Sequence, residues 1–424
     1  MESKGKLLIT GMGALSPLGI GVEAFWEALV RGECGVRRVS NFPVEGPLYQ
    51  SKIAAEVPSH DPIPWIKETD PALEGRYGSL ALPALGMALQ DAGLEPGGDV
   101  LARADLYVGS AQETADTLEK SLDSWVKGEL ERIPADAFSR VIPHAVTSAL
   151  ARNYRIRGRA ISLTSSCSSG VLALMLCTDW IRSGKSEIGV VVGADAISPL
   201  IFAGESLTGE LSKRNDDPAH ASRPFDRDQD GYIIGEGAVA LVVETDSHAQ
   251  ARGARPYASL GPFAATTDGT SFRYIDQEGT QISRCLSMVL QEVPADRIDH
   301  ISAHAPSIVA LDRAESKAIR RTFGEWADRI PVTSIKGAIG NPSAAGGLLQ
   351  IVSAVLGIRD GVIAPTLNLE NPLPGCDLNY VQRSPRRVKM STVLISAHGG
   401  GGLNAALTVH ACCSESRRGN SAGS

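Results

Sequence analysis

Short apolar runs alternate with longer amphipathic stretches along almost the whole chain, and this alternation most constrains the fold. We expect strands at 7–10, 160–164, 187–194, 237–245, 255–263, 298–304, 391–397 and 403–411. We expect helices at 21–32, 74–94, 135–153, 168–183, 276–292, 309–323 and 343–358. Strands and helices that alternate in this way pack as α/β layers around parallel strands.

The later half of the chain repeats the rhythm of the earlier half without repeating its residues. The length of 424 residues is long for one ordinary domain. We therefore expect an N-terminal half at 1–255 and a C-terminal half at 256–413. Residues 414–424 are small and polar, which is typical of a disordered tail.

Charge and cysteine content exclude several classes of protein. A net charge of −7 argues against general binding of nucleic acid, which needs clustered excess cation. Seven cysteines without framework spacing favour a reducing cytoplasm over a disulfide scaffold. The sequence has neither a signal peptide nor a run of about 18 apolar residues, so we expect no membrane span.

Two short segments resemble known binding motifs but lack a residue that each motif requires. Gly11-Met12-Gly13 follows a strand, but Ser16 replaces the third glycine of a dinucleotide fingerprint. The run from Asp226 to Gly231 opens like a calcium loop, but its twelfth position is Gly237 instead of glutamate. We therefore expect neither a bound dinucleotide nor a metal.

The most informative segment is I-S-L-T-S-S-C-S-S-G at 161–170. A strand pattern ends and a helix pattern begins at Cys167, which places a thiol at a helix N-terminus. The helix dipole and the free N–H groups there favour thiolate over thiol. Cys167 is thus a candidate nucleophile, and a small buried cysteine is the alternative.

A thiolate nucleophile usually needs a basic partner from elsewhere in the chain. His304 ends the apolar run H-I-S-A-H and precedes a loop, where parallel strands place functional groups. A structural histidine is the alternative. The four glycines at 399–402 follow another strand and form either a ligand-binding loop or a simple turn.

Four segments together resemble the β-ketoacyl synthases of fatty-acid and polyketide synthesis. They are T-G-M-G-A-L-S-P-L-G, T-S-S-C-S-S-G, R-N-D-D-P-A-H-A-S-R-P-F-D-R-D-Q-D-G-Y-I-I-G-E-G-A and R-D-G-V-I-A-P-T-L-N-L-E-N-P. The resemblance runs from Leu7 to about Val409 and favours the synthase I/II branch of the thiolase-like superfamily. It implies a duplicated five-layered α/β/α/β/α fold, an acyltransferase activity and a dimer.

The resemblance also implies roles for single residues. Cys167 would take the acyl group from a thioester, and the backbone N–H groups of Cys167 and Gly400 would form the oxyanion hole. His304 would serve decarboxylation of a malonyl thioester. Lys336 and Glu315 would match the family's lysine and acidic residue. Ser307, Gly399, Gly401 and Gly402 fall where the family binds pantetheine.

The sequence departs from the family pattern around these positions. Asn341 replaces the family's second histidine, and an amide can donate to an oxyanion but cannot exchange a proton at neutral pH. Ala305-Pro306-Ser307 replaces the family's H-G-T-x-T continuation after His304. His398 and Gly400 replace the two phenylalanines of the gating loop. His398 is either a base that compensates for the missing histidine or a hydrogen-bonded loop histidine.

We therefore expect a ketosynthase-type acyltransferase that performs decarboxylative condensation, in polyketide or other secondary metabolism. Acyl transfer to an oxygen or nitrogen nucleophile is the first alternative, and a subunit of a ketosynthase heterodimer is the second. Acyl groups would arrive as thioesters of acyl carrier protein or coenzyme A, with no bound cofactor. A homodimer is expected, although the sequence also allows a heterodimer.

Overall fold

The computed structural model describes residues 5–112 and 115–412. Its main sheet consists of two matching sets of strands, one from each half of the chain. The first set comprises β1 (Leu7–Ser16), β5 (Asp105–Gly109), β6 (Ala160–Leu163), β7 (Ile188–Asp195) and β8 (Gly237–Thr245). The second comprises β9 (Ala258–Thr267), β10 (His300–Ser302), β11 (Val332–Thr333), β14 (Thr392–Gly399) and β15 (Leu403–Ala411).

The two sets repeat one topology. Across the sheet, the first set has the order β6-β5-β7-β8-β1 and the second has the order β11-β10-β14-β15-β9. If the five strands of each set are numbered along the chain, both sets have the order 3-2-4-5-1. Strand directions also match, and β1 pairs with β9 to join the halves. This confirms the duplicated fold.

The expectation of parallel strands is correct only for part of each half. β5, β6 and β7 are parallel, as are β10, β11 and β14. The remaining pairs are antiparallel, as between β14 and β15. The link from Gly399 to Leu403 is too short for a crossover, so it can only join antiparallel strands.

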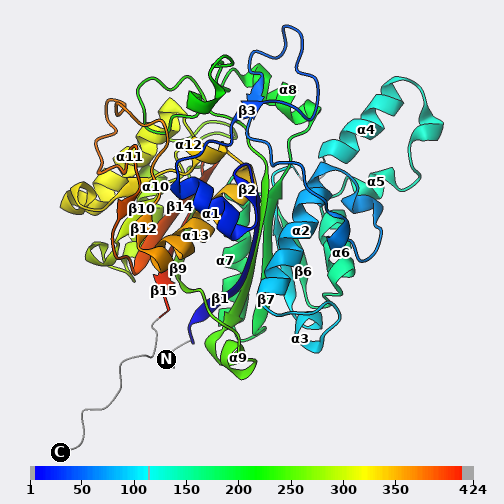
Figure 1. Ribbon diagram of the computed structural model, residues 1–424, viewed down its shortest axis with the longest axis horizontal. Coiled ribbons are helices and arrows are strands. Elements are labelled where there is room, and N and C mark those ends of the chain that lie inside the picture. The colour runs from blue at the N-terminus through cyan, green and yellow to red at the C-terminus, as the bar shows by residue number, and fades with distance from the viewer. Residues whose placement is uncertain (1–4, 113–114, 413–424) are drawn as a thin grey trace, which may run out of the picture.

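Helices cover both faces of each half and complete five layers (Figure 1). α2 (Arg76–Asp91) and α6 (His144–Tyr154) cover the outer face of the first half. α10 (Thr280–Leu290) and α11 (Val309–Phe323) cover the outer side of the second half. Between the halves lie α7 (Ser169–Arg182) and α13 (Ser343–Asp360), which contact each other and strands of both.

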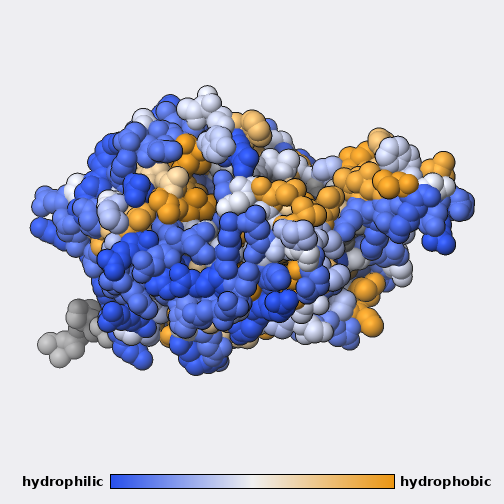
Figure 2. Space-filling view, turned by 90° about the horizontal axis from the view of Figure 1, so that it is seen from above, coloured by the Kyte–Doolittle hydropathy of each residue, from blue (hydrophilic) through white to orange (hydrophobic). Residues whose placement is uncertain are grey.

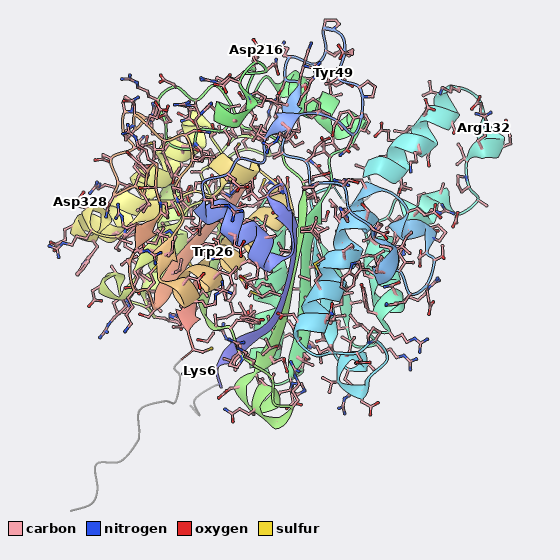
Figure 3. All side chains as sticks on the ribbon, viewed as in Figure 1. Lys6, Trp26, Tyr49, Arg132, Asp216 and Asp328 are labelled. Atoms are coloured by element: carbon pink, nitrogen blue, oxygen red, sulfur yellow. The ribbon has the colours of Figure 1, made fainter. Side chains whose placement is uncertain are left out.

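The central layer explains the sequence of α13. Residues 344–357 of this helix are all buried, which suits a helix that is apolar all round. α1 (Val22–Val30) closes one end of this layer, and its Trp26, labelled in Figure 3, donates from Nε1 to Asp360 at 2.7 Å. The main apolar cluster thus lies between the two halves.

One expected helix is divided in two. The stretch 135–153 forms α5 (Ala137–Arg140) and α6, separated at Pro143, since proline lacks the N–H that a continuous helix needs. The sequence patterns did not predict α4 (Ala115–Val126), which projects from the body with α5 (Figure 1). The shorter elements are β2 (Gly19–Ile20), β3 (Arg37–Arg38), β4 (Ile53–Ala54), α3 (Asp99–Ala102), α8 (Pro199–Thr208), α9 (Asp246–Ala251), α12 (Lys336–Ile339), β12 (Val362–Ile363) and β13 (Arg386–Arg387).

Two expectations about the chain's organisation remain. The division between 255 and 256 falls in the connection from α9 to β9 and stays a prediction. The tail at 414–424 lies outside the described residues. Within 5–112 and 115–412, no helix is both long and apolar enough to cross a membrane.

Candidate active site

A cavity of about 340 Å³ lies where strand ends of both halves meet. Its wall includes Cys167 from the first half and His304, Asn341, His398 and Gly400 from the second. Cys167 follows the carboxyl end of β6, His304 follows that of β10, and His398 lies at that of β14, so the cavity lies at the carboxyl ends of strands from both halves. The fold thus brings together five residues that the sequence singled out.

Cys167 occupies the expected junction between strand and helix. β6 ends at Leu163 and α7 begins at Ser169, so the thiol precedes the first turn of the helix. Its sulfur is hydrogen-bonded by Nδ2 of Asn341 at 3.5 Å and by Oγ of Ser166 at 3.9 Å. By contrast, burial raises the pKa of Cys285 to about 12, so this core thiol stays protonated.

Lys336 determines which nitrogen of His304 carries the proton. The ammonium nitrogen lies 3.1 Å from Nδ1 of His304 and 2.7 Å from its carbonyl oxygen. Because an ammonium group can only donate, Nδ1 accepts and the neutral ring holds its proton on Nε2. Burial is the largest cause that keeps the pKa of His304 well below its ordinary value, and the neighbouring Lys336 and His398 lower it further. His304 is therefore a neutral donor at physiological pH.

Lys336 is itself buried at the start of α12. Burial lowers its pKa to about 8, while nearby Cys167 and the carboxylates of Glu315 and Asp312 act in the opposite direction. The ammonium form therefore predominates at pH 7.

Glu315 of α11 supports the loop that carries His304. Its carboxylate accepts hydrogen bonds from the backbone N–H groups of His304 at 2.9 Å and Ala305 at 2.8 Å. Burial alone would raise the pKa of Glu315, but His398 and these two N–H groups bring it below its ordinary value. Glu315 is therefore ionised and fixes the position of His304 from behind.

His398 lies beside His304, with the ring centroids 5.6 Å apart. Its Nδ1 is 2.9 Å from Oδ1 of Asn404, and its Nε2 is 2.8 Å from Oγ of Ser396 and 3.3 Å from Glu315. Both ring nitrogens are thus engaged by protein groups. This arrangement favours the alternative of a hydrogen-bonded loop histidine, and the role of His398 as a base stays a prediction.

The glycine run divides into two pairs. Gly399 and Gly400 line the cavity, and the Gly400 N–H donates to Oγ of Ser166 at 3.1 Å. Gly401 and Gly402 form the turn before β15 with φ values of 79° and 75°. These two are absent from the cavity wall, so a pantetheine-binding role for them is not supported by their position.

Ser307 does not reach the cavity either. It is fully buried, donates from Oγ to the Gly231 carbonyl at 3.0 Å, and accepts from the Arg223 N–H at 3.1 Å. The expectation that Ser307 binds pantetheine is therefore wrong, since its hydroxyl is already used within the protein.

Sequence reasoning missed two groups that shape the cavity. Asp195, at the end of β7, accepts from Oγ of Ser110 and from the N–H groups of Ala111, Gln112 and Ala344. Burial raises the pKa of Asp195 to about 6, although the four hydrogen bonds act to lower it. A carboxylate that ends a fully apolar strand was the signal that could have revealed it.

The second missed group is a tyrosine with a buried ring. Tyr232 donates from its hydroxyl to Glu205 at 2.5 Å, and both line the cavity. Burial and the charge of Glu205 raise the pKa of Tyr232 well above its ordinary value. No pattern in the sequence pairs these two residues, since they lie 27 positions apart.

Comparison with known proteins identifies the family. The profile of the β-ketoacyl synthase N-terminal domain matches residues 5–249, and that of the C-terminal domain matches residues 257–370. The chain belongs to the β-ketoacyl synthase family. As a β-ketoacyl synthase it is an acyltransferase that condenses acyl and malonyl units, as expected from the sequence.

Individual relatives of this β-ketoacyl synthase cover nearly its whole length. The 3-oxoacyl-[acyl-carrier-protein] synthase 2 of Coxiella burnetii is 32% identical, over 96% of this chain and 98% of the relative. The tetracenomycin polyketide synthase ketoacyl synthase alpha subunit of Streptomyces glaucescens is 32% identical, over 95% and 96%.

Solved structures agree with the sequence relatives. The ishigamide ketosynthase/chain length factor superposes with a TM-score of 0.89 at 29% identity, over 97% of this chain and 100% of that one. A type II polyketide ketosynthase, solved with its acyl-carrier protein and bound to the hexaketide, gives 0.86 at 26% identity, over 96% and 99%. The thiolase-like ketosynthase fold is confirmed.

Proposed function

We propose that this ketosynthase extends acyl chains carried by an acyl carrier protein, with Cys167 as the acylated nucleophile. The observation that carries the proposal is the convergence of Asn341 and the neutral His304 on the cavity that holds the Cys167 thiol. Relatives named as polyketide ketosynthases, one of them solved with its acyl-carrier protein, support polyketide synthesis and this carrier.

The first half-reaction transfers the acyl group. The Cys167 sulfur attacks the thioester carbon, a new C–S bond forms, and the carrier leaves as a thiol that takes up the cysteine proton. The backbone N–H groups of Cys167 and Gly400 face the developing oxyanion in this proposal. Each such fixed donor contributes roughly 3 kcal/mol to the transition state in enzymes where it has been removed.

The second half-reaction needs donors more than a base. The malonyl C–C bond breaks, CO2 leaves, and its electron pair becomes an enolate, which displaces Cys167 from the acyl carbon. No proton is removed in this step, so the amide of Asn341 and the Nε2–H of His304 suffice to hold the enolate oxygen. Replacement of a histidine by Asn341 is thus compatible with condensation.

Intact-mass measurement tests the proposal. The purified protein should gain one acyl group from an acyl-carrier thioester, and then release a β-ketoacyl thioester when malonyl-carrier is added. Cys167→Ala should take up no acyl group, whereas Cys34→Ala, at a cysteine outside the cavity, should behave like the native protein. Product formed with an amine or alcohol, and none with malonyl-carrier, would favour the alternative of acyl transfer without decarboxylation.

We also propose that a second ketosynthase chain covers the projecting arm of α4 and α5. Figure 2 shows apolar side chains gathered on this end of the molecule, and Arg132 in Figure 3 marks its tip. The exposed apolar residues here are Leu118, Leu122, Trp125, Val126, Leu130 and Phe138. In the same half of the molecule, β6 is an edge strand of the sheet, which leaves backbone groups for pairing.

A second copy of this chain is the partner we expect, with a chain length factor as the alternative, since the ishigamide structure combines a ketosynthase and such a factor. Light scattering on the purified protein should give twice the monomer mass of 44.6 kDa. Trp125→Glu should give the monomer mass. We also place the protein in the cytoplasm, because its cysteines lack the spacing of a disulfide framework.

A further inference from the structure

The hydroxyl of Ser166 lies between two groups that the proposed reaction uses. It accepts a hydrogen bond from the Gly400 N–H at 3.1 Å and donates to the Cys167 sulfur at 3.9 Å. All three residues line the same cavity. In the described structure, the N–H group assigned to the oxyanion hole is therefore already occupied by a side chain.

The backbone holds Ser166 in this position against its own preference. Its φ of 51° lies in the left-handed region, which is costly for any residue other than glycine. Ser169 maintains this conformation, since its N–H and its Oγ both donate to the Ser166 carbonyl, at 3.0 and 2.6 Å. A Cβ on Gly399 would lie only 3.0 Å from Cβ of Ser166, so the glycine loop packs directly on this residue.

We propose that Ser166 is a catalytic residue whose hydroxyl alternates between two states. In the resting enzyme it connects the Gly400 N–H to the Cys167 sulfur and stabilises the thiolate. When a thioester carbonyl enters, the hydroxyl turns away and the Gly400 N–H passes to the carbonyl oxygen. The proposal rests on the proposed function of Cys167 and Gly400.

The chemistry of the sulfur gives a reason for the exchange. A thiolate is a charged acceptor, and a hydroxyl polarised by the Gly400 N–H is a better donor to it than an isolated hydroxyl. Once Cys167 has formed its C–S bond to the acyl carbon, the sulfur is an uncharged thioester atom and a weak acceptor. The hydrogen bond from Ser166 to this sulfur then contributes little, and the Gly400 N–H donates to the carbonyl oxygen instead.

Two variants and a matched control separate the hydroxyl from the backbone. Ser166→Ala removes the hydroxyl, and Ser166→Gly removes it while relieving the positive φ. Ser165→Ala removes a neighbouring hydroxyl whose contact is with Ser168 instead of the sulfur. The other titratable groups around Cys167 stay in place in all three: Glu205, Glu210, Tyr232, Arg273, Tyr274, His304, His398 and, behind them, Lys336.

The first measurement is the rate of Cys167 alkylation by iodoacetamide as a function of pH, with peptide mapping. We expect the midpoint of this profile to rise by about half to one pH unit in both Ser166 variants, as for loss of a weak hydrogen bond to a charged group. Ser165→Ala should leave it unchanged. An unchanged midpoint in Ser166→Gly would overturn the proposal, because the effect in Ser166→Ala would then come from the backbone.

The second measurement is the rate of self-acylation above both midpoints, where the thiolate is fully formed. Here the Ser166 variants should react a few-fold faster than the native protein, because the Gly400 N–H is free before the substrate arrives. A uniform loss of rate at every pH would overturn the proposal. Failure of the proposed function is distinguishable, since Cys167 would then take up no acyl group while its alkylation profile still shifts.

Discussion

The ammonium group of Lys336 donates to two atoms of one residue, Nδ1 and the carbonyl oxygen of His304. One ammonium group therefore determines the tautomer of the His304 ring and also holds the backbone of the same residue in place. It explains how a buried lysine serves the cavity without lining it, because its effect reaches the substrate only through Nε2 of His304.

Replacement of Lys336 by methionine should therefore slow decarboxylation more than acylation. Without its donor, Nδ1 can take the proton and Nε2–H is lost, which should cost about 10²–10³ in the rate of CO2 release. Release of CO2 from malonyl-carrier and the intact mass of the acyl-enzyme measure the two steps separately. Equal losses in both would indicate a folding defect instead.

The pH dependence of decarboxylation should report Lys336 as well. Burial lowers its pKa to about 8, so the ammonium donor is present below this pH and is lost above it. We expect CO2 release to decline as the pH rises through about 8. The decline should be absent from Lys336→Met, and its persistence there would assign it to another group.

Replacement of Asn341 by alanine should slow decarboxylation by about 10²–10³ through loss of an oxyanion donor. Acylation should fall less, because the Cys167 sulfur loses only one of its two hydrogen-bond donors. Asn341→Asp is the sharper test, since it keeps the size but replaces the donor with a negative charge near the thiol. An Asp variant with native CO2 release would contradict the assigned role.

His398 should matter for stability more than for chemistry. His398→Phe removes the hydrogen bonds to Asn404 and Ser396 and leaves the ionised Glu315 with its backbone donors alone. We expect a loss of about 1–3 kcal/mol in the free energy of unfolding, measured in urea. Condensation should fall only a few-fold. A loss of condensation with native stability would instead restore the interpretation of His398 as a base.

Asp195 should make the stability of the protein depend on pH. Burial raises its pKa to about 6, so the folded state holds this proton at a higher pH than the unfolded state does. The contribution of Asp195 to stability is therefore present at low pH and is lost as the pH rises through about 6.

The comparison of native protein with Asp195→Asn tests this sign. Asparagine presents an NH2 group to N–H donors, so the variant should be less stable by about 1–3 kcal/mol. The difference in urea unfolding between native protein and variant should be larger at pH 5 than at pH 8. A difference that is equal at both values would contradict the raised pKa.

The layered fold and the nucleophile could be predicted because their signals are local. Apolar periodicity along 343–358 predicts a helix, and the change of pattern at Cys167 places the thiol before α7, since both depend on neighbouring residues alone. Strand direction was predicted only in part, because an apolar run by itself is compatible with a parallel or an antiparallel neighbour. Only a short link, such as the one before 403–411, requires an antiparallel pair.

By itself, the sequence determined the family, the duplicated α/β layers and the residues gathered near Cys167, because motifs and periodicity are written along the chain. Only the tertiary structure decided what each side chain does there. The hydroxyl of Ser307 and the ring of His398 form hydrogen bonds with buried groups of the protein, whereas the hydroxyl of Ser166 donates to the Cys167 sulfur. Packing determines which polar groups from distant parts of the chain meet, and each must find a hydrogen-bond partner because an unpaired buried polar group costs free energy.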